Sequence, residues 1–189
     1  MAGQAVAIDP TNSNSHRALA AAQFYCNSNF DAAKAHADMA LVQNPNDQYS
    51  MCLLGFALTC NGHVAEGQSY SAESFKLNPL VPEACLYALA LGAYLEGNFA
   101  DAVSGFTRIS GAYDEILACL AASLWNLGQH DTARDAMQRF MTLKRQKMAE
   151  YPGNDAGQWR SYLLRRMPIA DHASLEKLFE GFRNAGLPV

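Results

Sequence analysis

The chain has 189 residues, half of them hydrophobic and 17% charged, with a mean hydropathy of −0.12 and a formal net charge of −4. This composition predicts a soluble globular protein and excludes a transmembrane protein, because no apolar run approaches the roughly 18 residues needed to cross a bilayer. The sequence also starts without the basic and apolar regions of a signal peptide, so we expect a cytoplasmic location.

Proline-containing turns recur along the first part of the chain. They are Asp9-Pro10, Asn44-Pro45 and Asn78-Pro79, and their prolines are 35 and 34 residues apart. Small residues recur in the same way, with spacings of 34, 35 and 31, at Ala33, Gly67, Ala102 and Ala133. A period near 34 residues with a proline closing each unit is typical of tetratricopeptide repeats, each a helix, a turn and a second antiparallel helix.

The chain therefore resembles the tetratricopeptide-repeat family over about residues 5–150. The resemblance implies an all-α fold, a right-handed superhelical solenoid of antiparallel helix pairs with a C-terminal capping helix. Such repeats are scaffolds for binding and carry no chemistry of their own. We accordingly expect residues 1–150 to form the solenoid, and residues 151–189 to form a linker, a degenerate helix and the capping helix.

In chain order, residues 5–10 have the features of the last turn of a second repeat helix. A repeat that ends so early has no first helix, so we expect a preceding repeat or domain. Complete repeats are expected at about residues 14–45 and 48–79, with a third from about residue 82 and a fourth from about residue 114. The third unit is shorter, and we expect a tighter turn at residues 109–111, where no proline closes it.

The end of the chain departs from the repeat pattern. The second helix of the fourth repeat is expected to continue to about residue 150 and becomes basic, and residues 151–155 stop it. A short helix is expected at residues 156–166. Asp171 is the predicted cap of a last helix that Gly186 ends. Four apolar residues of this helix are spaced to share one face, which we expect to pack on the preceding repeats: Leu175, Leu178, Phe179 and Phe182.

The concave surface of the repeat family is lined by the first helix of each unit. Counted onto this sequence, the lining is aromatic and nearly uncharged, and its most prominent members are Tyr25, Tyr49, Cys52, Phe56, Tyr87, Leu91, Tyr94 and Trp125. Aromatic anchors of this kind favour a protein or peptide partner that offers an amphipathic helix or an extended apolar segment. The same side chains are also typical of a buried core, and the chain's own C-terminal helix could cover them.

No constellation of residues indicates catalysis or a cofactor. The five histidines are scattered without metal-ligand spacing, and the five cysteines, an odd number without a Cys-x-x-Cys pair, argue against both a zinc site and a disulfide framework. No glycine-rich phosphate loop is present. Residues 134–189 carry 10 Lys/Arg against 6 Asp/Glu, but residues 1–133 carry 4 against 12, and this acidic body disfavours nucleic acid as a partner.

The C-terminal segment from Met167 to Pro188 resembles the end of proteobacterial class III adenylate/guanylate cyclases that carry tetratricopeptide repeats after a catalytic domain. No cyclase motif occurs in this chain, so the resemblance implies a non-catalytic regulatory region of a larger bacterial signalling protein. Two alternatives remain open. One is a free-standing repeat scaffold that associates with itself, and the other is a sensor that binds a small apolar ligand in the aromatic groove.

Overall fold

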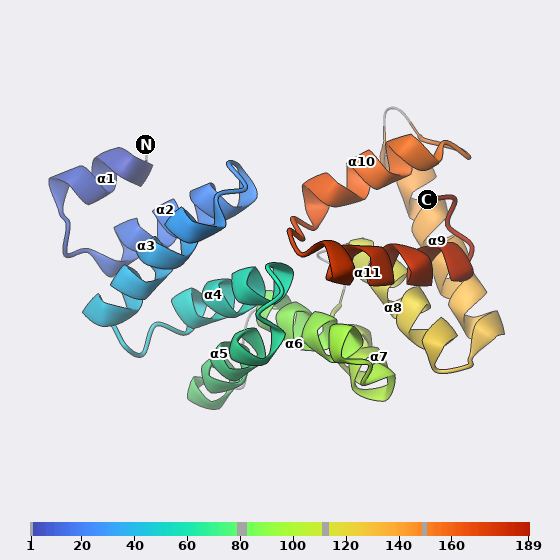
Figure 1. Cartoon of the computed structure of the whole chain (residues 1–189), viewed down its shortest axis with the longest axis horizontal. Coiled ribbons are helices and arrows are strands. Elements are labelled where there is room, and N and C mark those ends of the chain that lie inside the picture. The colour runs from blue at the N-terminus through green and yellow to red at the C-terminus, as the bar shows by residue number, and fades with distance from the viewer. Residues whose placement is uncertain (1, 79–82, 111–113, 149–150) are drawn as a thin grey trace. The chain divides into compact units, whose positions relative to one another are not determined.

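The structure is a computed structural model that describes residues 2–78, 83–110, 114–148 and 151–189. Within these residues the chain forms eleven helices and no strand (Figure 1). The chain divides into two compact units, residues 1–89 (unit 1) and residues 90–189 (unit 2), and the division falls inside one helix, α6. None of the helices in the described ranges is both long enough and apolar enough to cross a membrane.

Unit 1 consists of helices that pack in the order of the chain. They are α1 (Ala2–Ile8), α2 (Ser13–Tyr25), α3 (Phe30–Gln43), α4 (Gln48–Cys60), α5 (Val64–Leu77) and the start of α6 (Glu83–Glu96). The most extensive contacts join α2 to α3 and α4 to α5, and smaller ones join α1 to α2 and α3 to α4. Each repeat of unit 1 is therefore a helix pair that packs on the next.

Side-chain caps start α2 and α4, the first helices of the first two complete repeats. Asn12 accepts a hydrogen bond from the backbone N–H of Ser15, and Asp47 accepts from the N–H groups of Tyr49 and Ser50. Both caps lie two residues after a proline that cannot continue the preceding helix. The proline and the cap together end one repeat and begin the next. The third proline of this series, Pro79, lies outside the described residues, as does Pro82.

The crossing of α4 and α5 shows why the repeat pattern requires small residues. A Cβ atom on Gly55 would lie 2.8 Å from the carbonyl oxygen of Gly67, and one on Gly67 would lie 2.5 Å from that of Gly55. The two backbones therefore touch at this point. Around it, a core of Ala20, Ala37, Leu54 and Leu58 is buried, with Phe30, Leu41, Leu53 and Tyr70 packed against it.

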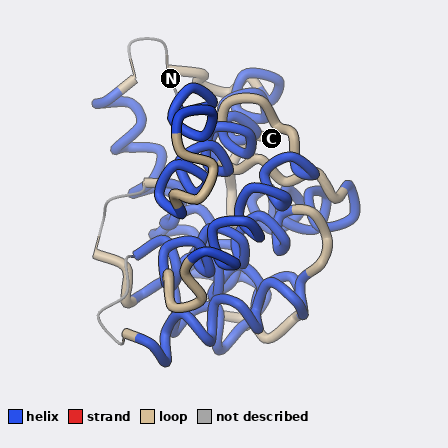
Figure 2. The backbone as a smooth tube through the Cα atoms, turned by 90° about the vertical axis from the view of Figure 1, so that its left-hand side faces the viewer, coloured by secondary structure: helices blue, strands red, loops and turns tan. Residues whose placement is uncertain are grey.

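Unit 2 contains the end of α6 and five further helices. They are α7 (Phe99–Thr107), α8 (Glu115–Asn126), α9 (His130–Lys147), α10 (Ala156–Arg166) and α11 (His172–Asn184), and Figure 2 shows helices in blue and the described loops and turns in tan. Helix α8 packs against α7, α9 and α11. With only 9 residues, α7 is shorter than α3 and α5, which have 14 each. The third repeat is thus shorter because its second helix, α7, is short. Gly111, in the tighter turn expected after this helix, lies outside the described residues.

Two sequence-based expectations are wrong in detail. Cys52 and Cys85 form a disulfide whose Cα atoms are 5.1 Å apart, although the odd number of cysteines argued against such a bond. Helix α4 and the start of α6 bring this one pair together, and the other three cysteines lie outside the disulfide, so an odd number of cysteines does not prevent a single bond. Helix α9 ends at Lys147 rather than near residue 150, because Met148 has an extended backbone.

Candidate functional site

Aromatic side chains of three successive first helices form a row in unit 1. The rings of Tyr25 (α2) and Phe56 (α4) are stacked with centroids 6.4 Å apart, and the rings of Phe56 and Tyr87 (α6) lie 5.2 Å apart. Tyr49 and Cys52 belong to the same α4 helix. We call the surface formed by Tyr25, Tyr49, Cys52, Phe56 and Tyr87 the first-helix face of unit 1.

The members of this face differ in exposure. Phe56, Tyr87 and Cys52 are buried, whereas the exposed fractions of Tyr25 and Tyr49 are 50% and 52%. The guanidinium of Arg17 lies 5.3 Å from the centre of the Tyr49 ring and is 3.0 Å from the carboxylate of Asp47. The inner aromatic rings therefore belong to the packed structure, and Tyr25 and Tyr49 are the apolar groups that another molecule can reach.

The remaining predicted binding residues, Leu91, Tyr94 and Trp125, lie in unit 2. Leu91 and Tyr94 are buried, and Trp125 is partly exposed and stacks on His130 with ring centroids 4.2 Å apart. The repeat pattern predicts one groove for these residues and for Tyr25 and Phe56. The structure places them on the corresponding helices of unit 2, α6 and α8.

Helix α11 lies on these helices of unit 2 (Figure 1). The Tyr94 hydroxyl donates a hydrogen bond of 3.1 Å to the carbonyl oxygen of Lys177, and the Lys177 ammonium donates one of 2.6 Å to the carbonyl oxygen of Leu95. A Cβ atom on Gly181 would be 2.2 Å from the Tyr94 oxygen and 2.8 Å from the Cβ of Ala122. The backbone of α11 is thus in direct contact with both α6 and α8.

The predicted apolar face of α11 is mostly inside the protein. Leu178, Phe179 and Phe182 are buried, and Leu175 is half-buried. The rings of Phe179 and Phe182 meet edge to face with centroids 5.9 Å apart, and the guanidinium of Arg160 from α10 lies 4.4 Å from the Phe179 centroid. Burial raises the pKa of Tyr94, so its hydroxyl stays protonated and keeps donating to α11 at any ordinary pH.

A buried cluster of charges holds α10 against α8 and α9. The carboxylate of Glu115 accepts hydrogen bonds from the Tyr162 hydroxyl, from Lys144 at 3.2 Å and from Arg166 at 3.1 Å. Burial alone would raise the pKa of Glu115, but these partners outweigh it and lower that pKa. Lys144, expected on a solvated basic face, is instead buried and ion-paired. The cluster therefore connects α8, α9 and α10, although its residues are up to 51 positions apart in the sequence.

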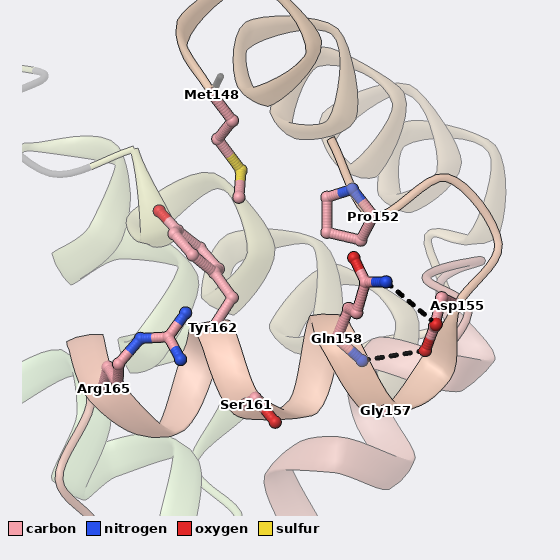
Figure 3. A pocket seen from close by; sticks show the side chains of 8 residues that line it. All are labelled: Met148, Pro152, Asp155, Gly157, Gln158, Ser161, Tyr162 and Arg165. Carbon is pink, nitrogen blue, oxygen red and sulfur yellow. Dashed lines mark hydrogen bonds between the residues drawn. The ribbon is translucent and has the colours of Figure 1, made fainter. Parts of the chain in front are cut away.

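Cavities open among the described residues of unit 2, and two of them have defined linings. One, of about 450 Å³, is bounded by the segment before α10 and by α10 itself, where Asp155 accepts hydrogen bonds from Gln158 (Figure 3). The other, of about 430 Å³, is lined by residues of α7, α8 and α9 and of the segment that precedes α8. The predicted aromatic binding residues line neither of them.

Metal-ligating residues do not gather in the described part of the chain, where no group of three His, Cys, Asp or Glu could hold an ion. The most suggestive pair is His16 and His36, whose Nδ1 atoms are 3.1 Å apart. Their ring centroids are 5.4 Å apart, so the two nitrogens face each other head-on. A metal between them would need about 2.0–2.1 Å on each side, more than this gap provides. The two histidine rings are therefore joined by a hydrogen bond.

Comparison with known proteins shows the fold. No protein-family model and no curated protein matches the sequence. Among solved structures, YrrB, a TPR protein with an unusual peptide-binding site, is 12% identical with a TM-score of 0.61, covering 98% of this chain and 92% of that one. PilF of Pseudomonas aeruginosa is 20% identical with a TM-score of 0.64, covering 97% and 76%. MamA is 15% identical with a TM-score of 0.58, covering 92% and 89%.

This chain has a tetratricopeptide-repeat fold. Within that fold, sequence reasoning missed the contribution of Cys85, Lys177 and Gly181. The sequence does hold a signal for the disulfide, because the separation of 33 residues between Cys52 and Cys85 is close to one repeat. Two residues one repeat apart lie at similar positions on adjacent first helices. For Lys177 and Gly181 no such local signal exists.

Proposed function

We propose that this chain is a non-catalytic protein-interaction module, and that a partner docks an amphipathic helix on the first-helix face of unit 1. A comparison of equivalent positions in the repeats supports this site. Tyr25 lies eight residues before the small residue Ala33, as Tyr94 lies eight before Ala102. Tyr94 holds the backbone of α11, whereas the ring of Tyr25, at the corresponding position, is half exposed. This difference between equivalent positions carries the proposal.

The chain itself indicates the chemistry of the partner. Helix α11 shows that an amphipathic helix with apolar residues at i, i+3 and i+4 suits the corresponding positions of unit 2. In unit 1 the residue equivalent to Ala122 is the larger Phe56, so a partner helix would lie farther out and contact Tyr25 and Tyr49. Residues 1–89 carry 3 Lys/Arg and 7 Asp/Glu, which favours a partner helix with basic residues.

The wider role that we propose is regulatory. The resemblance of the C-terminal segment to repeat-bearing cyclases supports a place in a larger bacterial signalling protein, where unit 1 would recruit a partner. The peptide-binding site named for YrrB shows that a protein of this fold can bind a peptide.

A selection from a displayed library of amphipathic peptides tests the binding site. We expect basic helical peptides to bind the full chain, and the double variant Tyr25→Ala, Tyr49→Ala to bind them at least about 30-fold more weakly, as for hot-spot aromatic residues. The matched control is Met39→Ala, Val42→Ala, two exposed apolar side chains of α3 with exposed fractions of 41% and 71%. A selection that yields no peptide, or peptides that bind the tyrosine variant as well as the wild type, would contradict the proposal.

A further inference from the structure

We infer that the Cys52–Cys85 disulfide is a thiol-operated control of the first-helix face of unit 1. This inference rests on the proposed function, because it concerns the regulation of the same surface. Cys52 is one helical turn before Phe56 on α4, and Cys85 is two residues before Tyr87 on α6. The disulfide and the Phe56–Tyr87 ring contact therefore join the same two helices within about one helical turn of each other.

The disulfide links two repeats rather than the two helices of one repeat. In a repeat array, the interface between neighbouring repeats sets the angle between them and hence the shape of the surface that both present. Cys52 and Cys85 have exposed fractions of 4% and 0%, and the Ser74 hydroxyl of α5 is 3.4 Å from the Cys85 sulfur. The bond is thus enclosed in the joint between α4, α5 and α6.

A low-molecular-weight thiol would open this bond by exchange. Its thiolate attacks one cysteine sulfur, forms a mixed disulfide and releases the other cysteine as a thiolate, which takes up a proton. A second thiol then attacks the mixed disulfide. In sum, the protein disulfide and two thiols give two cysteine thiols and one small disulfide, so the protein gains the two electrons that the reagent loses.

Reduction changes the geometry of the face because two thiols cannot stay at bonding distance. Both sulfurs are buried in a packed region, so there is little room for the cysteine side chains to rotate apart, and we expect α4 and the start of α6 to shift and to carry the Phe56 and Tyr87 rings with them. A partner fitted to the oxidised face then binds more weakly. By reciprocity, the bound partner protects the disulfide from reduction by the same factor.

The remaining cysteines give the experiment an internal reference. Cys26, Cys60 and Cys119 lie outside the disulfide, and of these three Cys26 is exposed whereas Cys60 and Cys119 are buried. Thiol titration of the denatured, unreduced full chain is expected to give three thiols, and five after treatment with dithiothreitol. The peptide selected on the wild type is then titrated against three samples of the full chain: oxidised, reduced, and the double variant Cys52→Ser, Cys85→Ser.

We expect the reduced wild type and the double variant to bind the peptide about fivefold more weakly or worse than the oxidised protein, the lower end of typical coupling between sites. Circular dichroism of each sample checks that its helices are intact. The control variant Cys26→Ser should keep the full response to reductant. Bound peptide should also raise, by the same factor, the ratio of reduced to oxidised dithiothreitol at which the fourth and fifth thiols appear at equilibrium.

The possible failures are distinguishable. Five thiols before reduction would show that the bond does not form. Three thiols with equal peptide affinity before and after reduction would overturn the control of the face while leaving the proposed function intact. Three thiols with no peptide selected would overturn the proposed function, and with it the regulation of that site.

Discussion

The turn between the two helices of each repeat shows how a single residue carries the pattern. Gly62, Gly97 and Gly128 have φ values of 86°, 86° and 82°, and the corresponding residue of the first repeat is Ser28, with φ of 50°. Their spacings of 34, 35 and 31 are those of the small crossing residues. Only glycine adopts this left-handed region without steric cost. The first repeat therefore departs from the other three at this turn.

Replacing Ser28 by glycine should stabilise unit 1. The change removes the cost of a side chain in the left-handed region, and we expect a gain of about 1 kcal/mol, which urea unfolding followed by circular dichroism measures. The reverse change in the next repeat, Gly62→Ser, should cost about as much. A loss of stability in Ser28→Gly would show that the serine side chain contributes more than its backbone strain.

The His16–His36 hydrogen bond should make the stability of unit 1 depend on pH. His16 Nε2 is 2.9 Å from the Pro10 carbonyl oxygen, which can only accept, so this nitrogen carries a proton and the neutral ring accepts from His36 at Nδ1. Burial and the neighbouring His16 lower the pKa of His36 below its usual value of about 6.5. The unfolded chain therefore binds a proton more readily than the folded one.

This difference in proton binding sets the direction in which the folding stability changes with pH. Stability is fully present above about pH 6.5 and falls as the pH decreases through the lowered pKa of His36. Urea midpoints measured from pH 8 to pH 5 should decrease in the wild type, and the variant His36→Gln should lose part of that dependence. Equal pH dependence in both proteins would contradict the assignment. The exposed-turn residue His63, replaced by glutamine, is the control.

At the scale of helices, local sequence signals predicted where helices begin and end, but they did not predict the contacts between residues far apart in the sequence. Helix α10 occupies the expected residues 156–166, and α11 begins after the expected cap Asp171, because caps, prolines and apolar spacing act within a few residues. The disulfide, the contacts of α11 with α6 and α8, and the burial of Lys144 depend on residues many positions apart. A single sequence shows which residues share one face of a helix, but it does not show which helix packs against that face.

The position of α11 depends on the absence of a side chain at Gly181. Gly181→Ala would place a Cβ within 2.2 Å of the Tyr94 oxygen and 2.8 Å of the Ala122 Cβ, so α11 must move away. We expect a loss of about 1–3 kcal/mol, as for other overpacked sites, measured by urea unfolding. The matched control is Gly157→Ala in α10, whose Cβ would meet only the Asp155 side chain at 3.3 Å.

That control should be neutral or slightly stabilising, because alanine favours a helix more than glycine does. If both variants unfold at the wild-type midpoint, the backbone of α11 does not lie against Tyr94 and Ala122. The experiment thus tests the contact that distinguishes the first-helix residues of unit 2 from those of unit 1.

At the scale of the whole molecule, the two units can be followed separately in one experiment. Both tryptophans, Trp125 and Trp159, lie in unit 2, so tryptophan fluorescence reports that unit, whereas circular dichroism reports all helices. Each unit has its own buried residues, and stability in repeat arrays is the sum of local terms between neighbours. A change that weakens one unit should therefore affect the two signals differently.

Two variants, Cys52→Ser in unit 1 and Glu115→Gln in unit 2, test whether the units unfold separately, because each weakens one unit. Loss of the disulfide should cost unit 1 about 3 kcal/mol and shift an unfolding transition seen by circular dichroism, with the fluorescence transition unchanged. Loss of the Glu115 charge leaves Lys144 with Asp114 alone and should cost unit 2 about 3 kcal/mol, shifting the fluorescence transition. If Cys52→Ser shifts the fluorescence transition as much as the circular dichroism transition, the chain unfolds as one cooperative block, and thiol control of unit 1 would then act on the entire protein rather than on one binding face.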